Sequence, residues 1–537
     1  MVDIEGFDVQ VLADICAISA LSEGSVYLGK GNKGYLFAPK ECGVLVLGPP
    51  RSGKTTSVII PNVLTANSAV VVTSTKRDVF DQTWQFRRKT SPCYIFDPVQ
   101  TTSLPKEVVS VGWSPVDAAG KFDKALLTAK SMVWAARPDG NKGDAQHWTQ
   151  KSTELLATLL HAASISGVPF SEALSWLHRH EGGAALRILD SGGQNSEMAF
   201  DVLSGILNTD FREQSGIWST VSSVCACYES SGAVLSTELP RVDYKNLLEQ
   251  KSTVYIVAPG ENQQLLAPVI AGFIGDIKRS VYMENLNYDL QRGKTNDAHF
   301  TKLLLVLDEL ANIAPLYDLP EIISEGGSQG VTTVACLQDL SQARRRWPVI
   351  ADGFFSLFHT KFILPGLGDR QTLENISLLC GEKDEVIYSK TSHSKRTDKK
   401  LDSKTASIRK VKRMPPDAIS RGNKGKALVI MGSVAGEVTL TPSYTLKNTL
   451  AKEVFSVRTK EGNPRKDSGL SVKVELTGTE RKFIWSKNRR NVGQKSSFPV
   501  AEPKFEQLTI LGEEKVKHQE QKSRILYRDK PGGSRTL

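Results

Sequence analysis

A short stretch near the start of the sequence combines the residue types that bind phosphate groups. Residues 48–55 read GPPRSGKT and fit the pattern G-x-x-x-x-G-K-[ST], between a predicted strand and a predicted helix. Glycines at these positions let backbone N–H groups close around phosphate oxygens, and the following helix presents its positive end to them. The alternative is a glycine-rich turn with a chance Lys-Thr pair. We expect the phosphate-binding loop to consist of Gly48, Pro49, Pro50, Arg51, Ser52, Gly53, Lys54, Thr55 and Thr56.

This loop and a later pair of acids together predict a hydrolytic site. Lys54 would reach the β- and γ-phosphates of a nucleoside triphosphate, and the Thr55 hydroxyl would bind Mg²⁺. The run LLLVL ends in Asp308 and Glu309, so a buried strand would bring Asp308 to the metal and Glu309 to the attacking water. An apolar strand that ends in Asp-Glu is common by itself. Paired with the phosphate-binding loop it indicates hydrolysis, because a switch that only binds nucleotide does not need the second acid.

Polar side chains further along the chain could act on the same phosphate. Gln338 follows the apolar run VTTVACL, 29 residues after Glu309, and could contact the γ-phosphate or the water. The alternative is an ordinary polar residue at a strand end. Arg344, Arg345 and Arg346 follow soon after. Any of them could stabilise phosphoryl charge across a subunit interface, or the three could form a solvated helix face.

Short apolar runs that alternate with helical stretches predict an α/β fold with a parallel sheet covered on both faces. From 117 to 235 the periodicity is helical, which predicts an all-α insertion. The stretch 386–426 predicts a mobile surface loop or a β-hairpin arm, and beyond 441 we expect an extended or disordered chain. The predicted strands are 43–47, 69–73, 93–96, 253–257, 303–307, 331–336, 361–364 and 427–432. The predicted parts are an N-terminal segment (1–30), a nucleotide-binding domain in two pieces (31–116 and 236–440), the all-α domain (117–235) and a basic, flexible tail (441–537).

The positive charge of the chain lies late in the sequence. Residues 441–537 hold 21 Lys or Arg against 11 Asp or Glu, and residues 383–426 hold 14 against 5. Residues 1–382 are acidic, with 33 Lys or Arg against 41 Asp or Glu. A basic segment favours polyanions such as nucleic acid or anionic lipid. The alternative is a solvated region that keeps the protein soluble.

Length and composition are typical of a soluble protein with more than one domain. The chain has 537 residues, of which 40% are hydrophobic and 23% charged, so wholesale disorder and collagen-like repetition are excluded. Seven cysteines without a C-x-x-C pair argue against structural zinc and favour reduced thiols in the cytosol. Residues 1–24 contain no Lys or Arg, unlike a signal peptide, and no apolar run is long enough to span a bilayer.

The combination of motifs resembles one family. The stretches GPPRSGKTTSVIIPNVL, CYIFDP, VGWSPVD, TVYIVAPG, LLLVLDELANIAPLYDLPEIISEGGSQGVTTVACLQDLSQARRRW and FFSLFHTKFIL are similar to type IV secretion coupling proteins of the TraG/TraD type, the ATPases of conjugative DNA transfer. The resemblance covers roughly residues 30–435 and is most specific over 303–380. It implies a RecA-like P-loop NTPase domain with a parallel-dominated sheet, interrupted by an all-α domain.

The resemblance also implies cofactors, residue roles and partners. ATP and Mg²⁺ would be the cofactors, with Thr55 and Asp308 at the metal and Lys54, Glu309 and Gln338 as catalytic residues. The all-α domain would dock the substrate complex, and DNA, either single- or double-stranded, would enter a type IV secretion channel with its bound relaxase. A hexamer with ATP at the subunit interfaces is implied as well.

Two departures from the family pattern affect these expectations. Family members usually begin with two transmembrane helices, whereas this chain reaches its phosphate-binding loop by residue 48 with none. We therefore expect a cytoplasmic chain, held at the cytoplasmic face of the membrane by a separate anchoring protein, or a cytosolic branch of the family. Some members carry an arginine finger in the turn that here reads GGSQG (326–330) and holds no arginine, so the trans-acting residue is unassigned.

Two other functions fit part of the same evidence. In the first, the chain is an adaptor whose helical insertion and basic tail bind relaxase or effector proteins, and the nucleotide only controls assembly. In the second, it is an ATPase that energises protein export without nucleic acid. The charge distribution argues mildly against the second, since the basic late segments would have no polyanion to bind.

Overall fold

The computed structural model describes most of the chain up to Thr445 and two strands beyond it. The described residues are 24–31, 34–99, 104–136, 144–291, 300, 302–351, 353–393, 401–445, 470–477 and 480–487. Among them, no helix is both long and apolar enough to cross a lipid bilayer.

A twelve-stranded sheet forms the centre of the fold, in the order β2-β1-β14-β13-β10-β3-β9-β8-β4-β7-β5-β6. Strands from β10 to β6 in this order run parallel, and β13, β14, β1 and β2 extend the sheet with antiparallel pairs. The predicted parallel-dominated α/β fold is confirmed. The strands are β1 (Tyr27–Gly31), β2 (Gly34–Phe37), β3 (Val44–Leu47), β4 (Ala69–Ser74), β5 (Cys93–Phe96), β6 (Val109–Ser110), β7 (Thr253–Val257), β8 (Leu303–Leu307), β9 (Val331–Leu337), β10 (Thr360–Ile363), β13 (Lys426–Met431) and β14 (Val434–Thr439).

The central strands are apolar throughout because helices cover both faces of the sheet. All residues of β3, β4, β7, β8 and β9 are buried. Alternate side chains of β3 enter different cores: Leu45 and Leu47 pack with α12 (Gln263–Gln291), whereas Val44 and Val46 pack with the helices that follow the phosphate-binding loop. These helices are a π-helical turn, η1 (Thr55–Ile59), then α2 (Ile60–Thr65) and α3 (Asp78–Arg87).

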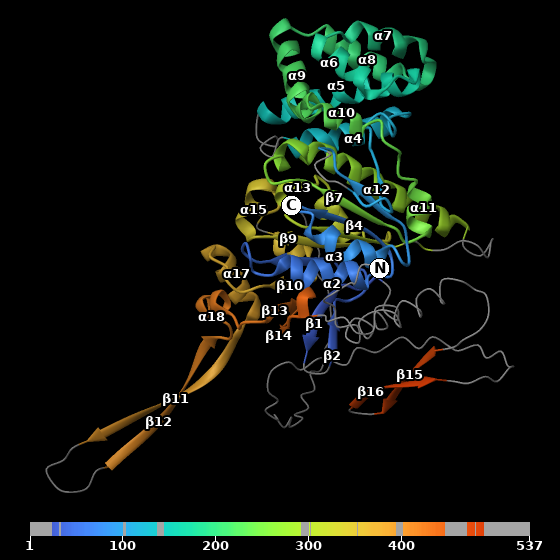
Figure 1. Cartoon of the computed structure of the whole chain (residues 1–537). Helices are drawn as coiled ribbons and strands as arrows, with labels where there is room; N and C mark the ends of the chain where they lie inside the picture. Colours follow the sequence, from blue (N-terminus) through green and yellow to red (C-terminus); the bar gives the residue numbers. More distant parts are fainter. Residues whose placement is uncertain are drawn as a thin grey trace, which may run out of the picture. The chain divides into compact units, whose positions relative to one another are not determined.

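The described residues between β6 and β7 form helices and turns (Figure 1). Helix α4 packs against both α5 and α12, so it joins the helical region to the sheet domain. The domain boundaries at 116–117 and 235–236 stay predictions. The helices here are α4 (Phe122–Ala136), α5 (Asp144–Ser166), α6 (Phe170–Arg179), α7 (Gly182–Ser191), η2 (Gly193–Asn195), α8 (Glu197–Leu207), α9 (Phe211–Val224), η3 (Ala226–Glu229), α10 (Ser231–Ser236) and α11 (Tyr244–Glu249).

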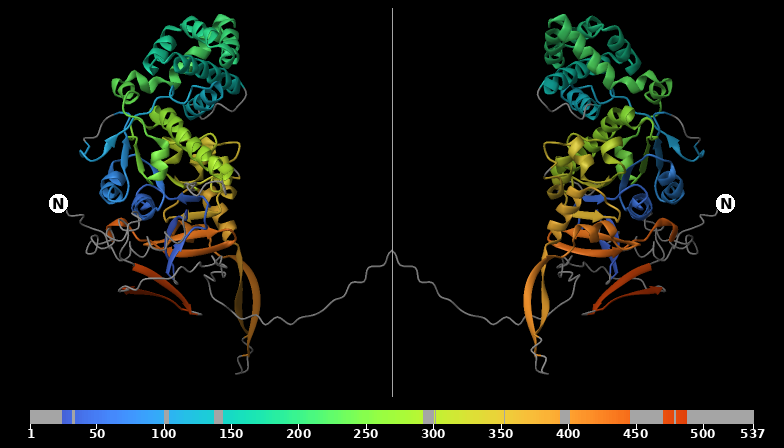
Figure 2. Two further views of the ribbon diagram at one scale, coloured as in Figure 1. Left: turned by 90° about the vertical axis from the view of Figure 1, so that its right-hand side faces the viewer. Right: turned by 90° about the vertical axis from the view of Figure 1, so that its left-hand side faces the viewer.

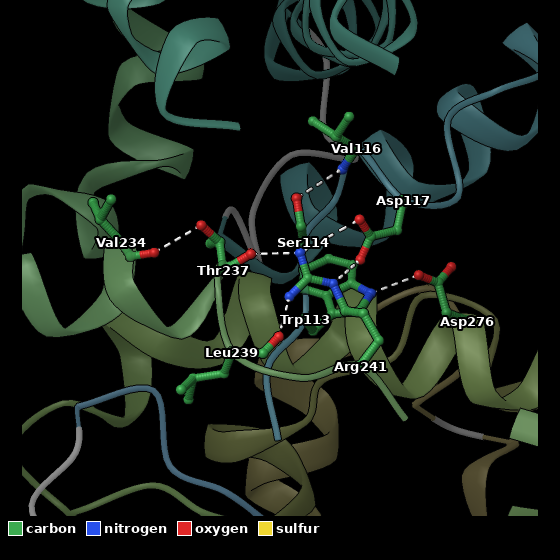
Figure 3. A network of polar contacts seen from close by, with 9 residues as sticks. All are labelled: Trp113, Ser114, Val116, Asp117, Val234, Thr237, Leu239, Arg241 and Asp276. Atoms are coloured by element: carbon green, nitrogen blue, oxygen red, sulfur yellow. Dashed lines mark hydrogen bonds and ion pairs between the residues drawn. The ribbon is translucent and has the colours of Figure 1, made fainter. Parts of the chain in front are cut away.

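The two chain segments that enter and leave the helical region are tied together (Figure 3). The backbone N–H of Gly112 donates to the carbonyl of Pro240 at 2.9 Å. Arg241 pairs with the Asp117 carboxylate and donates to the carbonyl of Leu239 at 2.6 Å. A side chain at position 112 would not fit, because a Cβ there would lie 2.1 Å from a backbone oxygen of the returning segment.

Trp113 anchors the same junction to the sheet domain. Its indole N–H donates to the Asp276 carboxylate of α12 at 2.6 Å, and both side chains are buried. Burial raises the pKa of Asp276, although the Arg279 guanidinium and the indole N–H oppose this. The entry point of the helical region is thus fixed by packing and by a satisfied buried carboxylate.

Two late segments are more ordered than the sequence patterns predict. The expected mobile loop is wrong for most of 386–426, because β11 (Glu382–His393) and β12 (Leu401–Lys412) form a two-stranded sheet and are followed by α18 (Pro416–Arg421). The alternative of a β-hairpin arm is confirmed. Within the predicted flexible tail, β15 (Leu470–Thr477) pairs with β16 (Glu480–Lys487). Most other residues of 441–537 lie outside the described part of the chain.

Candidate functional site: the carboxyl edge of the central strands

The predicted phosphate-binding loop lies between β3 and η1, at the carboxyl edge of the parallel strands. Arg51 and Gly53 have positive φ values of 64° and 96°, which turn the chain sharply back toward the helix. Gly48 lies in a tight space, because a Cβ there would lie 2.5 Å from Ser52 Oγ and 3.0 Å from the Cβ of Leu364. Asn62 of α2 exchanges hydrogen bonds with the backbone N–H and carbonyl of Tyr27, at 2.8 and 2.9 Å, and so fixes the helix against β1.

Lys54 is buried inside this loop. Its ammonium group donates to the carbonyls of Gly48 at 2.5 Å and Pro49 at 3.2 Å. Two oxygens of the site, Ser52 Oγ and Asp308 Oδ1, are buried without a hydrogen-bond partner. Buried polar atoms normally have partners, so this pair fits a site whose remaining ligands are a phosphate group and a metal ion.

The two predicted metal ligands lie side by side. Thr55 Oγ1 donates to Asp308 Oδ2 at 3.5 Å, although the residues are far apart in sequence. Asp308 follows β8, and its backbone carbonyl accepts a hydrogen bond from Thr73 of β4 at 3.1 Å. Burial raises the pKa of Asp308 to about 7; the Glu309 carboxylate adds to this rise, and the Lys54 ammonium opposes it. A hydroxyl beside a buried carboxylate suits a hard cation such as Mg²⁺.

Glu309 and Gln338 also meet, as neighbouring parallel strands require. Gln338 Nε2 donates to Glu309 Oε2 at 3.4 Å, because β8 and β9 are adjacent and end at the same edge of the sheet. Glu309 has a left-handed backbone with φ 50° and ψ 46°, directly before α13 (Leu310–Ile313). A left-handed conformation is rare for a residue other than glycine and is often found at functional sites.

Two further polar residues support this pair and were not predicted. Asn312 Nδ2 donates to Glu309 Oε2 at 3.5 Å, and the Gln342 side chain accepts from the Gln338 backbone N–H at 2.8 Å. Asn312 lies three residues after Glu309, and Gln342 lies four residues after Gln338. Polar residues at that spacing after a strand end are the signal that could have identified them.

The three arginines of α15 (Leu340–Arg346) have different environments, so the predicted solvated face is wrong for one of them. Arg346 is buried and donates to the carbonyls of Ala311 at 2.7 Å and Ala135 at 3.3 Å. This position excludes it as a residue that reaches another subunit. Arg344 pairs with Asp369 at 2.8 Å, whereas Arg345 is exposed.

Helix α17 (Arg370–Cys380) contacts α15 and the late strand β12. Asp369 precedes α17 and accepts from the Thr372 backbone N–H at 3.0 Å, while Thr372 Oγ1 accepts from the backbone N–H of Leu340 at 3.1 Å. The chain after Gln338 is therefore held against the start of α17. The remaining helices are α14 (Leu319–Ser324) and α16 (Phe354–Leu357), with a short turn, η4 (Ser443–Thr445), at the end of the sheet domain.

Known proteins resemble this chain in sequence and in fold. Two conjugal transfer proteins TraG from Escherichia coli are similar to the chain: one is 24% identical over 440 residues, and the other is 23% identical over 402 residues. The alignments cover 76% and 70% of this chain, and 67% and 61% of the relatives' own lengths.

Among solved structures, the bacterial conjugative coupling protein TrwB in an unbound form has the same fold. It matches with a TM-score of 0.56 and 16% identity, over 82% of this chain and 93% of the solved chain, TrwBdeltaN70. TrwB in complex with ADP and Mg²⁺ matches with a TM-score of 0.53 and 18% identity, over 78% of this chain and 88% of the solved chain. The model of one protein family, described as type IV secretory system conjugative DNA transfer, matches residues 15–436. The resemblance inferred from the motifs is thus confirmed, and the chain belongs to the type IV secretory system conjugative DNA transfer family.

Proposed function

We propose that the chain is a Mg²⁺-dependent ATPase that couples hydrolysis to the recruitment or movement of DNA in conjugative transfer. One observation carries the proposal: Lys54, Thr55, Asp308, Glu309 and Gln338 come from three separate segments and converge at one edge of the sheet. Membership of a DNA-transfer family supports DNA as the polymer.

Each residue of the site has a separate proposed role in ATP hydrolysis. Lys54 would leave the carbonyls that now hold its ammonium group and bind the β- and γ-phosphates, while the backbone of 48–56 surrounds them. Thr55 and Asp308 would hold Mg²⁺, which when bound neutralises phosphate charge. Glu309 would accept a proton from the attacking water, and Gln338, already in contact with Glu309, would orient that water or the γ-phosphate.

The proposed partners follow from the family rather than from the site. They are DNA, a relaxase and its accessory proteins, components of a type IV secretion channel, and further copies of this chain, with six as the expected number. We also propose that a separate membrane protein holds the chain at the cytoplasmic face of the membrane. Arg345 is the exposed arginine of α15 and stays the candidate for phosphoryl contact between subunits.

Glu309→Gln tests the central role. The amide keeps the size of the side chain and its contact with Gln338 but cannot accept the proton, so we expect ATP to bind with turnover abolished. Lys54→Ala should lose binding as well as turnover, since it removes the phosphate contact. Glu197→Gln, on the exposed surface of α8, is the matched control and should hydrolyse ATP normally. Full turnover in Glu309→Gln would remove Glu309 from the mechanism.

A further inference from the structure

The β11–β12 ribbon is a structural feature that the proposed ATPase site does not use. Its strands pair over twelve register positions, from Glu382 opposite Lys412 to His393 opposite Leu401. At about 3.4 Å per residue, such a ribbon is roughly 40 Å long. It extends away from α17 and α18 (Figures 1 and 2). Among the described strands, β11 and β12 pair only with each other, so each has one unpaired edge.

One face of the ribbon carries three exposed apolar side chains next to the charged pairs Glu382–Lys412 and Asp384–Lys410. Val386 lies opposite Ile408 in the register, and Tyr388 is two residues further along the same face. Val386 is 47% exposed, Tyr388 72% and Ile408 73%. Single exposed apolar residues are normal in proteins, but three that gather on one face of a two-stranded sheet are not. A two-stranded sheet is only marginally stable in water, so this face and these edges indicate a missing partner.

The two edges of the ribbon differ in charge. The first residues of β11 include three exposed acids and one base, whereas the last residues of β12 are basic and contain no acid. Each acid lies opposite a base in the register: Glu382 opposite Lys412, Asp384 opposite Lys410, and Glu385 opposite Arg409. In 382–385 the unpaired edge of β11 is therefore acidic, apart from Lys383, and in 409–412 the unpaired edge of β12 is basic. Further along, β11 contains Lys390 and β12 contains Asp402.

We propose that the ribbon pairs edge to edge with the ribbon of a second copy of this chain, β12 of one copy against β11 of the next. Two ribbons in the same orientation place these strands antiparallel, so the register within one copy can repeat between copies. The unpaired backbone groups would then form hydrogen bonds, and Ile408 would pack against Val386 of the partner subunit. Pairing of like edges would instead place acids beside acids or bases beside bases.

Pairing of unlike edges has a consequence for assembly. A contact between two different surfaces of the same chain adds copies head to tail, which produces a ring when the rotation closes. The inference rests on the homo-oligomer named under the proposed function, and it assigns a contact surface to that oligomer.

The contact can be trapped by mixing two single variants of the full chain. Asp384→Cys and Lys410→Cys place thiols on opposite edges of separate molecules. Directly opposed residues of an antiparallel pair lie about 5 Å apart between Cα atoms, which suits a disulfide. With mild oxidant and a non-hydrolysable ATP analogue with Mg²⁺, we expect the mixture to give several-fold more cross-linked dimer than either variant alone. Raising the salt concentration should reduce the yield, because exposed charges are screened.

Controls separate this contact from the background thiols. Met198→Cys, on exposed α8, replaces Asp384→Cys in a matched mixture and should give no product above that of the unmodified chain. The double variant Tyr388→Ser with Ile408→Thr keeps the charges and removes apolar area. It should shift sedimentation velocity profiles toward the monomer.

Three results would overturn the inference, and they have different consequences. If the unmodified chain stays monomeric with the ATP analogue and Mg²⁺, the proposed homo-oligomer fails together with the ribbon contact. If the oligomer forms but the mixture gives no product above the controls, the ribbon contact fails and the proposed function stands. If the double variant assembles normally but binds DNA more weakly, the ribbon is a DNA-binding arm instead.

Discussion

Asp308→Asn should stabilise the nucleotide-free protein while removing the proposed metal ligand. Asp308 is 5% exposed, and its Oδ1 atom has no hydrogen-bond partner. Its pKa is raised from an ordinary value of 3.8 to about 7, mainly by burial. The folded state therefore holds a proton that the unfolded state has already released, so folding stability falls as the pH rises between these two values. At a pH above both pKa values, the ionised Asp308 carboxylate lowers the free energy of unfolding by about 4 kcal/mol.

The pH dependence of this difference is the sharper measure. Between pH 5 and pH 8 the advantage of Asp308→Asn over the unmodified chain should grow by about 2.5 kcal/mol and level off above pH 7. Thermal and urea unfolding at pH 5, 6.5 and 8, without nucleotide or Mg²⁺, would measure it. Asp417→Asn, whose carboxylate is largely exposed, is the control and should show no such trend. The reasoning would be refuted if Asp308→Asn were less stable than the unmodified chain at pH 8. It would also be refuted if the difference in unfolding free energy between the two did not depend on pH.

Three further substitutions test the packing that holds the site. Arg346→Met leaves the carbonyls of Ala311 and Ala135 without their donor, so it should cost about 2 kcal/mol of unfolding free energy, whereas exposed Arg345→Met should change it by less than about 0.5 kcal/mol. Equal urea midpoints for the two variants would count against the buried role of Arg346. Gly112→Ala pushes a Cβ into a backbone oxygen at 2.1 Å, so limited proteolysis should cut the junction of the helical region faster; an unchanged rate would contradict this. Asn62→Ala leaves the Tyr27 backbone N–H unpaired, which should reduce the free energy of unfolding by about 1–3 kcal/mol and so lower the melting temperature. Asn67→Ala, at a more exposed site, is its control, and equal melting temperatures would show that the tie to β1 is unimportant.

The parts of the site that follow strand ends were predictable from the sequence. Val44–Leu47, Leu303–Leu307 and Val331–Leu337 are apolar throughout because they are buried on both faces. In a parallel sheet such strands end at one edge, so the residues after them had to come together. This is why Asp308 lies beside Thr55, and Gln338 beside Glu309.

Features that depend on distant packing were not predictable. Arg346 follows two other arginines, a pattern typical of a solvated helix face. In the structure it is buried and donates to carbonyls of α13 and of the end of α4. Strands β1, β2 and β14 were missed because these short antiparallel strands, outside the parallel part of the sheet, have no long apolar run. The ribbon of β11 and β12 was predicted only as the alternative to a mobile loop, because it depends on cross-strand pairing, which composition alone does not reveal.

The most direct test of the central claim is the ATP hydrolysis rate of the purified chain with Mg²⁺, measured without DNA, with single-stranded DNA and with duplex DNA. Lys54→Ala provides the blank. We predict hydrolysis above this blank that one DNA form stimulates, which would identify the polymer that the ATPase acts on. A rate equal to the Lys54→Ala blank in all three conditions would contradict the ATPase. Hydrolysis indifferent to both DNA forms would contradict its coupling to DNA.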